Sequence, residues 1–177
     1  MALVAFTSCT QAASKQASAK SSLVESAIIP DEKVVEIMGD SIANIVFSPK
    51  ATVVAYKMSP SETPGDNDRT IGGVKVANEI GKINKTFFPI MQFLLSDSAS
   101  YSGDIIVPAR PFVARMALEF KLKKENVFLL FSFGSGEIAA IKNGKEIWHH
   151  HIGDVRKFIL FFEKMKKDKE LEFYLKK

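Results

Sequence analysis

The fold is decided by residues 115–152, RMALEFKLKKENVFLLFSFGSGEIAAIKNGKEIWHHHI. Large apolar residues alternate with polar or small ones over residues 115–122, which predicts a strand with one buried face. Residues 127–133 are almost all apolar and predict a central strand that is covered on both sides. A glycine-containing turn at residues 134–136 leads into a third strand at residues 137–142. Consecutive strands with short connections predict an antiparallel meander.

The Asn143-Gly144 pair is the most specific local feature of the chain. Both central positions of a type I′ turn need positive φ, which Asn and Gly adopt most readily. We therefore expect a two-residue turn that joins residues 137–142 to a fourth strand, residues 145–152.

Upstream of the meander, the sequence predicts helices around a hairpin. Apolar residues recur at helical spacing after Asp31, a capping residue, and Gly39-Asp40 divides them into two short helices or one kinked helix. Residues 51–58 and 73–80 predict two antiparallel strands joined by a long polar loop.

Two more helices are expected on either side of the meander. One covers Phe87 to Leu95, with Pro89 in its first turn, where proline is tolerated. The other is capped by Asp154, and a short basic helix from Asp168 is expected to end the chain. This order predicts an α+β fold: a mainly antiparallel sheet with a C-terminal β-meander, and helices packed mostly on one face.

The chain of 177 residues has room for one full-sized domain. Residues 10–22, TQAASKQASAKSS, contain no large apolar residue, so residues 1–22 are expected to be a leader and a flexible linker. Residues 23–177 are expected to form a single α+β globular domain, with a short extended piece at residues 104–107.

The formal net charge is +4 and the pI about 9.1, with much of the excess in the last fourteen residues. A nucleic-acid binder usually has a stronger and more organised basic surface, so nucleic acid is an unlikely partner. The chain has one cysteine, Cys9, which excludes an intramolecular disulfide and a cysteine metal cluster. No apolar run approaches the roughly 20 residues that span a bilayer.

The segment Leu3–Cys9, LVAFTSC, resembles the end of a bacterial lipoprotein signal, and its Phe-Thr-Ser-Cys ending is similar to those of Bacteroidetes lipoproteins. A basic start is missing, so we expect Met1 to lie inside a longer leader. The resemblance implies an acylated Cys9, a membrane partner through that lipid anchor, and a periplasmic or outer-membrane lipoprotein of the bacterial cell envelope. The alternative is a chance cysteine in a cytoplasmic protein.

Residues 84–175 also resemble small uncharacterised Bacteroidetes lipoproteins with a domain of unknown function. The matching pieces are Leu94-Leu95-Ser96-Asp97 with Tyr101, Pro111-Phe112, Leu118-Glu119-Phe120, Leu130-Phe131-Ser132-Phe133 and Asn143-Gly144-Lys145. These pieces are packing and turn features, so the resemblance implies no activity.

Three consecutive histidines, His149-His150-His151, are the obvious metal candidates. On a strand, His149 and His151 share one face, so at most two of the three can converge. The expected turn pairs Ile138 with His149 and Glu137 with His150. Zinc needs three or four ligands, and no other histidine is present, so structural or surface histidines are favoured over a metal site at His149 and His151.

Lysines of the C-terminal tail, Lys166, Lys167 and Lys169, are candidate binding residues. The favoured interpretation is a solvated helix face, and the alternative is a contact surface for lipid headgroups or polyanions. Gly134-Ser135-Gly136 lacks the spacing of a nucleophile elbow and is interpreted as a turn.

The leading functional hypothesis is therefore a non-catalytic envelope lipoprotein that binds a partner or ligand and needs no cofactor. It identifies no catalytic residues. One alternative is a soluble cytoplasmic interaction module, and the other is a metal-dependent enzyme centred on His149 and His151.

Overall fold

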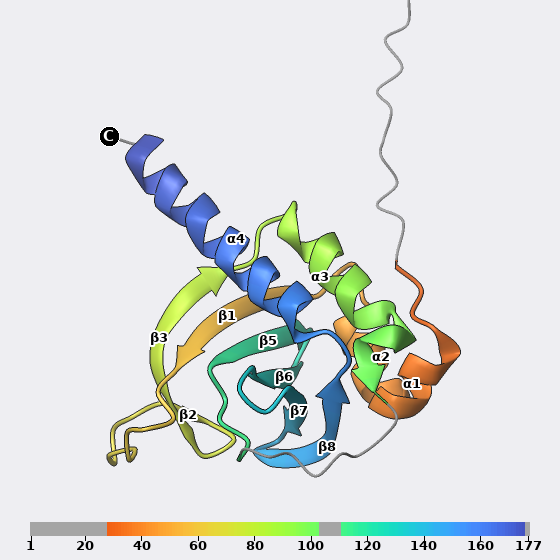
Figure 1. The fold of residues 1–177 in the computed structure, drawn as a ribbon, viewed down its shortest axis with the longest axis horizontal. Helices are drawn as coiled ribbons and strands as arrows, with labels where there is room; N and C mark the ends of the chain where they lie inside the picture. The colour runs from red at the N-terminus through yellow and green to blue at the C-terminus, as the bar shows by residue number, and fades with distance from the viewer. Residues whose placement is uncertain (1–27, 103–110, 176–177) are drawn as a thin grey trace, which may run out of the picture.

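The computed structural model describes residues 28–102 and 111–175, and only the backbone of residues 168–175. In these residues, a curled antiparallel sheet has the strand order β2-β3-β1-β5-β6-β7-β8-β4 (Figure 1). The strands are β1 (Thr52–Met58), β2 (Thr70–Ile71), β3 (Val74–Lys82), β4 (Tyr101–Ser102), β5 (Met116–Leu122), β6 (Glu125–Ser132), β7 (Glu137–Lys142) and β8 (Lys145–Ile152). The helices are α1 (Glu32–Met38), α2 (Asp40–Val46), α3 (Phe87–Ser96) and α4 (Val155–Leu175), with a 3-10 turn, η1 (Ser98–Ser100).

The α+β class and the C-terminal meander are confirmed. Strands β5, β6, β7 and β8 pair in succession, each antiparallel to the next. Asn143 and Gly144 have φ values of 53° and 75°, as the expected turn requires. The β1–β3 hairpin is also confirmed as antiparallel.

A β-bulge in β8 makes the expected register of the last hairpin wrong. Ile141 pairs with Glu146, but the next residue, Ala140, pairs with Trp148, so Ile147 is the extra residue. An extra residue on one strand moves every later pair by one position. Ile138 therefore lies opposite His150, and Glu137 lies opposite His151.

The prediction that β5 is buried on one face only is wrong. Ala117 and Glu119 are buried as completely as their neighbours. The β2–β3 hairpin lies over this second face of the sheet and places Ile71 in a second apolar cluster. The other members of this cluster are Tyr56, Met58, Ala114, Ala117, Leu130 and Ile141.

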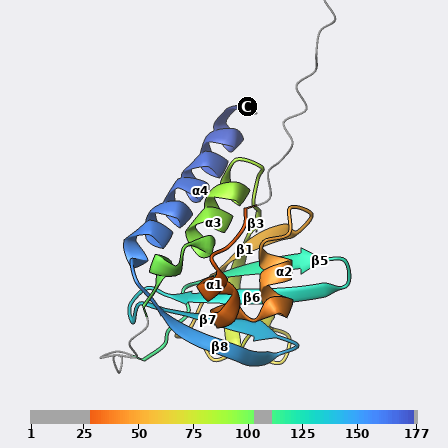
Figure 2. The same ribbon diagram turned by 90° about the vertical axis from the view of Figure 1, so that its right-hand side faces the viewer.

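The helices pack on the other face of the sheet, opposite the one that the β2–β3 hairpin covers (Figure 2). Helix α4 packs on β6, where Phe131 lies 5.3 Å from both Phe158 and Phe162 between ring centroids. Helix α3 lies beside α4, and the rings of Phe87 and Phe161 are 5.9 Å apart. The main core draws residues from α1, α2, α3 and α4.

The helix boundaries confirm most local expectations. Gly39 separates α1 from α2, and Pro89 lies in the first turn of α3. Asp154 caps α4 by accepting a hydrogen bond from the Arg156 amide, 3.1 Å away. The prediction of a separate helix from Asp168 is wrong, because α4 continues to Leu175.

Some expectations lie outside the described residues: Cys9 with its leader, and the extended piece at residues 104–107. Among the helices that the structure describes, none is long and apolar enough to cross a membrane.

Candidate functional site

The most promising binding site is a groove between α4 and strands β1 and β5, called here the α4 groove, with a volume of about 250 Å³. Its apolar floor is formed by Met58, Met116, Phe133, Ile159 and Phe162. The site is small compared with most ligand pockets, which measure about 300–1,000 Å³. It therefore suits a small ligand with an apolar body.

The rim of the α4 groove is predominantly cationic. Lys57 from β1, Arg115 just before β5 and Lys166 from α4 line the rim, together with Glu163. All four side chains are exposed. Within residues 28–102 and 111–167, no ion pair is found for any of the three cations. The rim can therefore offer positive charge to a ligand without first breaking an ion pair to another residue of the described part.

Helix α4 contributes to the groove through one continuous stripe. Phe162 and Glu163 follow Ile159 by three and four residues, and Lys166 follows Glu163 by three, so the four share one broad face of the helix. The lower part of this stripe is apolar and faces the strands, and its end carries the charges. The stripe thus joins the floor of the groove to its rim.

The three candidate lysines of the tail do not act as one group in the groove. Lys166 lines the groove, whereas the exposed Lys167 is not among its lining residues. The side chain of Lys169 lies outside the described part of the chain. Lys57 and Arg115 were missed because no local pattern separates a rim cation from any other exposed basic residue on a strand.

His149 lies between two carboxylates. Its Nε2 is 3.3 Å from Glu137 Oε1, and its Nδ1 is 3.6 Å from Glu146 Oε1. The bulge at Ile147 brings Glu146 to the same side of β8 as His149. The ring of Phe112 packs edge-on against the imidazole at 4.7 Å.

No metal-binding cluster of three or more His, Cys, Asp or Glu side chains is found among the described residues. His151 lies opposite Glu137 in the strand ladder, but no contact joins its side chain to that of His149. His150 faces Trp148 on the same strand at 5.7 Å. Burial, followed by the two neighbouring histidines, lowers the pKa of His150.

The Glu137–His149 contact is close but incompletely satisfied. Although the two side chains approach to 3.3 Å, the Nε2 of His149 makes no hydrogen bond, and neither does the buried Oε2 of Glu137. A buried carboxylate with an unpaired oxygen costs stability. The pair can orient the imidazole, and Ser132, whose hydroxyl lies 2.6 Å from that of Ser135, lies opposite Glu137 in the strand ladder.

Glu119 is the centre of a buried polar network that sequence patterns did not reveal. Its carboxylate accepts hydrogen bonds from Tyr56 Oη at 2.7 Å and Asn126 Nδ2 at 3.2 Å, and it lies 3.1 Å from Lys121 Nζ. Arg69 covers the Tyr56 ring at 4.4 Å and reaches Glu119 at 3.3 Å. The network fastens the β2–β3 hairpin to the sheet.

The protonation of this network follows from its contacts. Burial alone would raise the pKa of Glu119, but hydrogen bonds from Tyr56 and Asn126 and the Lys121 ion pair outweigh it and lower the pKa. Burial, reinforced by the Glu119 carboxylate, raises the pKa of Tyr56 to about 12. Glu119 is therefore charged and Tyr56 neutral at pH 7, and the hydrogen-bonding capacity of the carboxylate is used internally.

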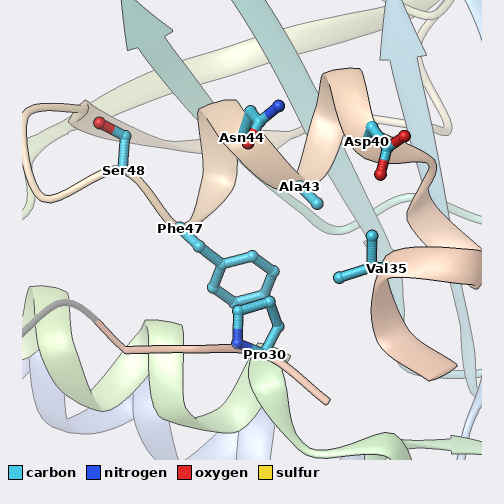
Figure 3. Close-up of a pocket in the computed structure, with 7 residues that line it drawn as sticks. All are labelled: Pro30, Val35, Asp40, Ala43, Asn44, Phe47 and Ser48. Carbon is cyan, nitrogen blue, oxygen red and sulfur yellow. The ribbon is translucent and has the colours of Figure 1, made fainter. Parts of the chain in front are cut away.

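A second hollow lies between the N-terminal segment and helices α1 and α2 (Figure 3), with a volume of about 370 Å³. The Phe47 ring lies against Pro30. Val35 and Ala43 complete the apolar part of the lining, and Asp40, Asn44 and Ser48 supply its polar part.

Comparison with known proteins finds no matching family model, no curated protein of similar sequence and no matching solved structure.

Proposed function

We propose that this protein is a non-catalytic, lipid-anchored envelope protein that binds a small amphipathic anion in the α4 groove. The observation that supports the proposal is the apolar floor beneath Lys57, Arg115 and Lys166, which have no ion pair within the described part of the chain.

The ligand class follows from the two parts of the groove. Apolar surface contributes about 25 cal/mol per Å² when it is removed from water, so the floor favours an acyl chain or an aromatic ring. The rim carries three cations and one carboxylate, Glu163, so it favours a single anionic group. A medium-chain fatty acid or an aromatic carboxylic acid meets both requirements.

Calorimetric titration with octanoate tests the ligand class, and octanol and acetate are the matched probes. Octanoate should bind most tightly, because octanol lacks the charge and acetate lacks the apolar body. Arg115→Gln and Lys166→Gln should each weaken octanoate binding by up to about fivefold, since an exposed charge pair contributes at most about 1 kcal/mol.

Lys167→Gln is the matched control, because Lys167 is an exposed lysine of the same helix and does not line the groove. Equal affinity for octanoate and octanol, or an equal effect of Lys167→Gln and Lys166→Gln, would contradict an anion-binding groove.

The envelope location and the membrane partner depend on Cys9, and the support for them is the lipoprotein-like LVAFTSC segment. The test is the intact mass of the mature protein from its native cell, with its partition between detergent and water. We expect a chain that begins at Cys9, carries acyl mass and enters the detergent phase. An unacylated aqueous chain that retains Met1 would favour the cytoplasmic interaction module instead.

Elemental analysis of the purified protein tests the remaining alternative, a metal-dependent enzyme centred on His149 and His151. Stoichiometric zinc would favour that enzyme over the binding protein.

A further inference from the structure

The exposed large hydrophobic side chains are concentrated in the helical layer. Across residues 28–102 and 111–167 they are Ile29, Ile90, Phe93, Ile147 and Leu160, with exposed fractions of 87%, 46%, 64%, 54% and 56%. Ile90 and Phe93 belong to α3, and Leu160 belongs to α4. Ile147 is the one member of this set that lies on the sheet, at the bulge of β8.

Ile90 and Phe93 lie one turn apart on the outer side of α3. The inner side of this helix is filled by Met91 and Leu95, which are 1% and 0% exposed. Since residues three apart on a helix are neighbours, Ile90 and Phe93 form one apolar strip that faces away from the core.

Leu160 is on the outer side of α4, opposite the buried Phe158 and Phe162. Helices α3 and α4 lie next to each other in both views (Figures 1 and 2), and their contact is the Phe87–Phe161 ring pair. The outer sides of the two helices therefore belong to the same helical layer, away from the sheet.

Exposed lysines accompany these apolar side chains. Lys157 and Lys164 lie one turn before and one turn after Leu160, and Lys85 precedes α3. None of these three lysines has an ion pair within the part of the chain that the structure describes. Glu163, which directly precedes Lys164 on α4, belongs to the rim of the α4 groove. Exposed apolar side chains flanked by lysines are typical of surfaces that lie on anionic lipid.

The N-terminal segment enters the structure at the same layer. The Asp31 amide donates a hydrogen bond to the Ser96 carbonyl at the end of α3, 3.0 Å away, and Asp31 Oδ2 accepts one from the Ser98 amide at 2.8 Å. The hydrogen bond from Ser98 lowers the pKa of Asp31. Ile29, two residues before Asp31, therefore lies next to α3.

We propose that the outer sides of α3 and α4, with Ile90, Phe93 and Leu160 as apolar contacts and Lys85, Lys157 and Lys164 as cations, dock onto the surface of an anionic lipid bilayer. The proposal rests on the acyl anchor of the proposed function, which would hold the domain at that surface. An anchor on the same chain would keep these apolar and basic side chains at high effective concentration near the membrane, so even a weak surface contact could form.

The test exploits the single cysteine of the chain. Purified full-length protein is coupled through Cys9 to a maleimide-headgroup lipid in vesicles of phosphatidylcholine with or without phosphatidylglycerol. Phe93→Trp is compared with Ile147→Trp, a matched exposed position on the sheet, and the parent chain supplies the background of Trp148. Lipids brominated in the acyl chain quench tryptophans that enter the bilayer.

We expect strong quenching of Phe93→Trp on vesicles with phosphatidylglycerol, and quenching of Ile147→Trp at the level of the parent. Lys157→Gln combined with Lys164→Gln should reduce the Phe93→Trp quenching at least about threefold, because the lysines attract the anionic surface. Equal quenching at positions 93 and 147, or no dependence on the anionic lipid, would overturn the proposal.

The outcome of this quenching experiment does not depend on the α4 groove or on natural acylation of Cys9. The maleimide link supplies the anchor whether or not the cell acylates Cys9, so a failure of the docking surface leaves the mass measurement unaffected. Arg115→Gln, which tests the groove, should leave the Phe93→Trp quenching unchanged. If the tryptophans of Ile147→Trp and Phe93→Trp were quenched to the same extent, the protein would be adsorbing to the vesicles non-specifically.

Discussion

Glu119 shows how a single buried charge can depend on several neighbours. The carboxylate is 2% exposed, and it is held by Tyr56, Asn126 and Lys121. Removing one partner would leave a buried polar group unsatisfied, which costs more than the hydrogen bond contributed. The same contacts favour the ionised form and connect the stability of the fold to pH.

The pH dependence of stability should therefore change in Glu119→Gln. A carboxyl group with a lowered pKa in the folded state contributes stability above its unfolded pKa, near the ordinary value of 4.5, and that contribution is lost as the pH falls through the folded pKa. Glu119→Gln should be about 1–3 kcal/mol less stable than the parent at pH 7, and this difference should shrink on acidification.

Urea denaturation at a series of pH values down to about pH 3 measures this difference. Glu79→Gln is the control, because its carboxylate is exposed and 3.8 Å from Arg69. A constant difference between parent and Glu119→Gln across the series would contradict the assigned role of the carboxylate.

At the scale of elements, Gly39 determines how α1 passes into α2. Its φ of 75° and ψ of 147° lie in a region that is essentially open to glycine alone. The residue ends α1 and also precedes the first residue of α2, so it sets the angle between two helices that both contribute to the core.

Gly39→Ala should destabilise the protein by about 1–3 kcal/mol, because a Cβ is strained in this conformation although no neighbouring atom blocks it. Gly134→Ala is the matched control: this glycine also has open space around its Cβ position, and its φ is not positive. Thermal unfolding should show a lower Tm for Gly39→Ala alone. Equal Tm values for the two variants would remove the conformational explanation.

The bulge at Ile147 is another feature at the scale of elements. The Asn143-Gly144 turn was predicted correctly, but the register was right for only the two pairs nearest the turn. Turn chemistry determines how a hairpin starts, and it does not determine whether an extra residue is inserted further along. The functional consequence is local, because the bulge places Glu146 beside His149.

At the scale of the whole molecule, the packing of α4 against the sheet is a central part of the hydrophobic core. Phe131 from β6 packs between Phe158 and Phe162 of α4 and is also 6.3 Å from Phe133. This ring cluster places α4 over the sheet and thus forms one side of the α4 groove, to which Phe133 and Phe162 contribute directly.

Phe131→Ala should destabilise the protein by about 3–5 kcal/mol, since a large cavity would remain between α4 and the sheet. Leu160→Ala, on the same helix but 56% exposed, should change the free energy of unfolding by less than about 0.5 kcal/mol. Urea denaturation followed by circular dichroism compares the two. Similar losses in both variants would mean that the ring cluster does not hold α4.

Local patterns in the chain were sufficient for the longer strands, the meander, the hairpin of β1 and β3, and the α+β class, but not for the short strands β2 and β4. Periodicity, capping residues and turn residues act over a few positions, so they can be recognised without the rest of the fold. The same patterns named Lys166, Lys167 and Lys169 together as binding candidates, and of these Lys166 lines the α4 groove.

The tertiary structure decided four features: the covered second face of the sheet, the buried Glu119, the position of His149 between two carboxylates, and the α4 groove. Each depends on residues far apart in the chain: Arg69 meets Glu119, and Lys57, Arg115 and Lys166 meet at one rim. An exposed lysine and a groove lysine have the same local sequence properties, because only the packing of α4 against β1 and β5 brings the three cations together.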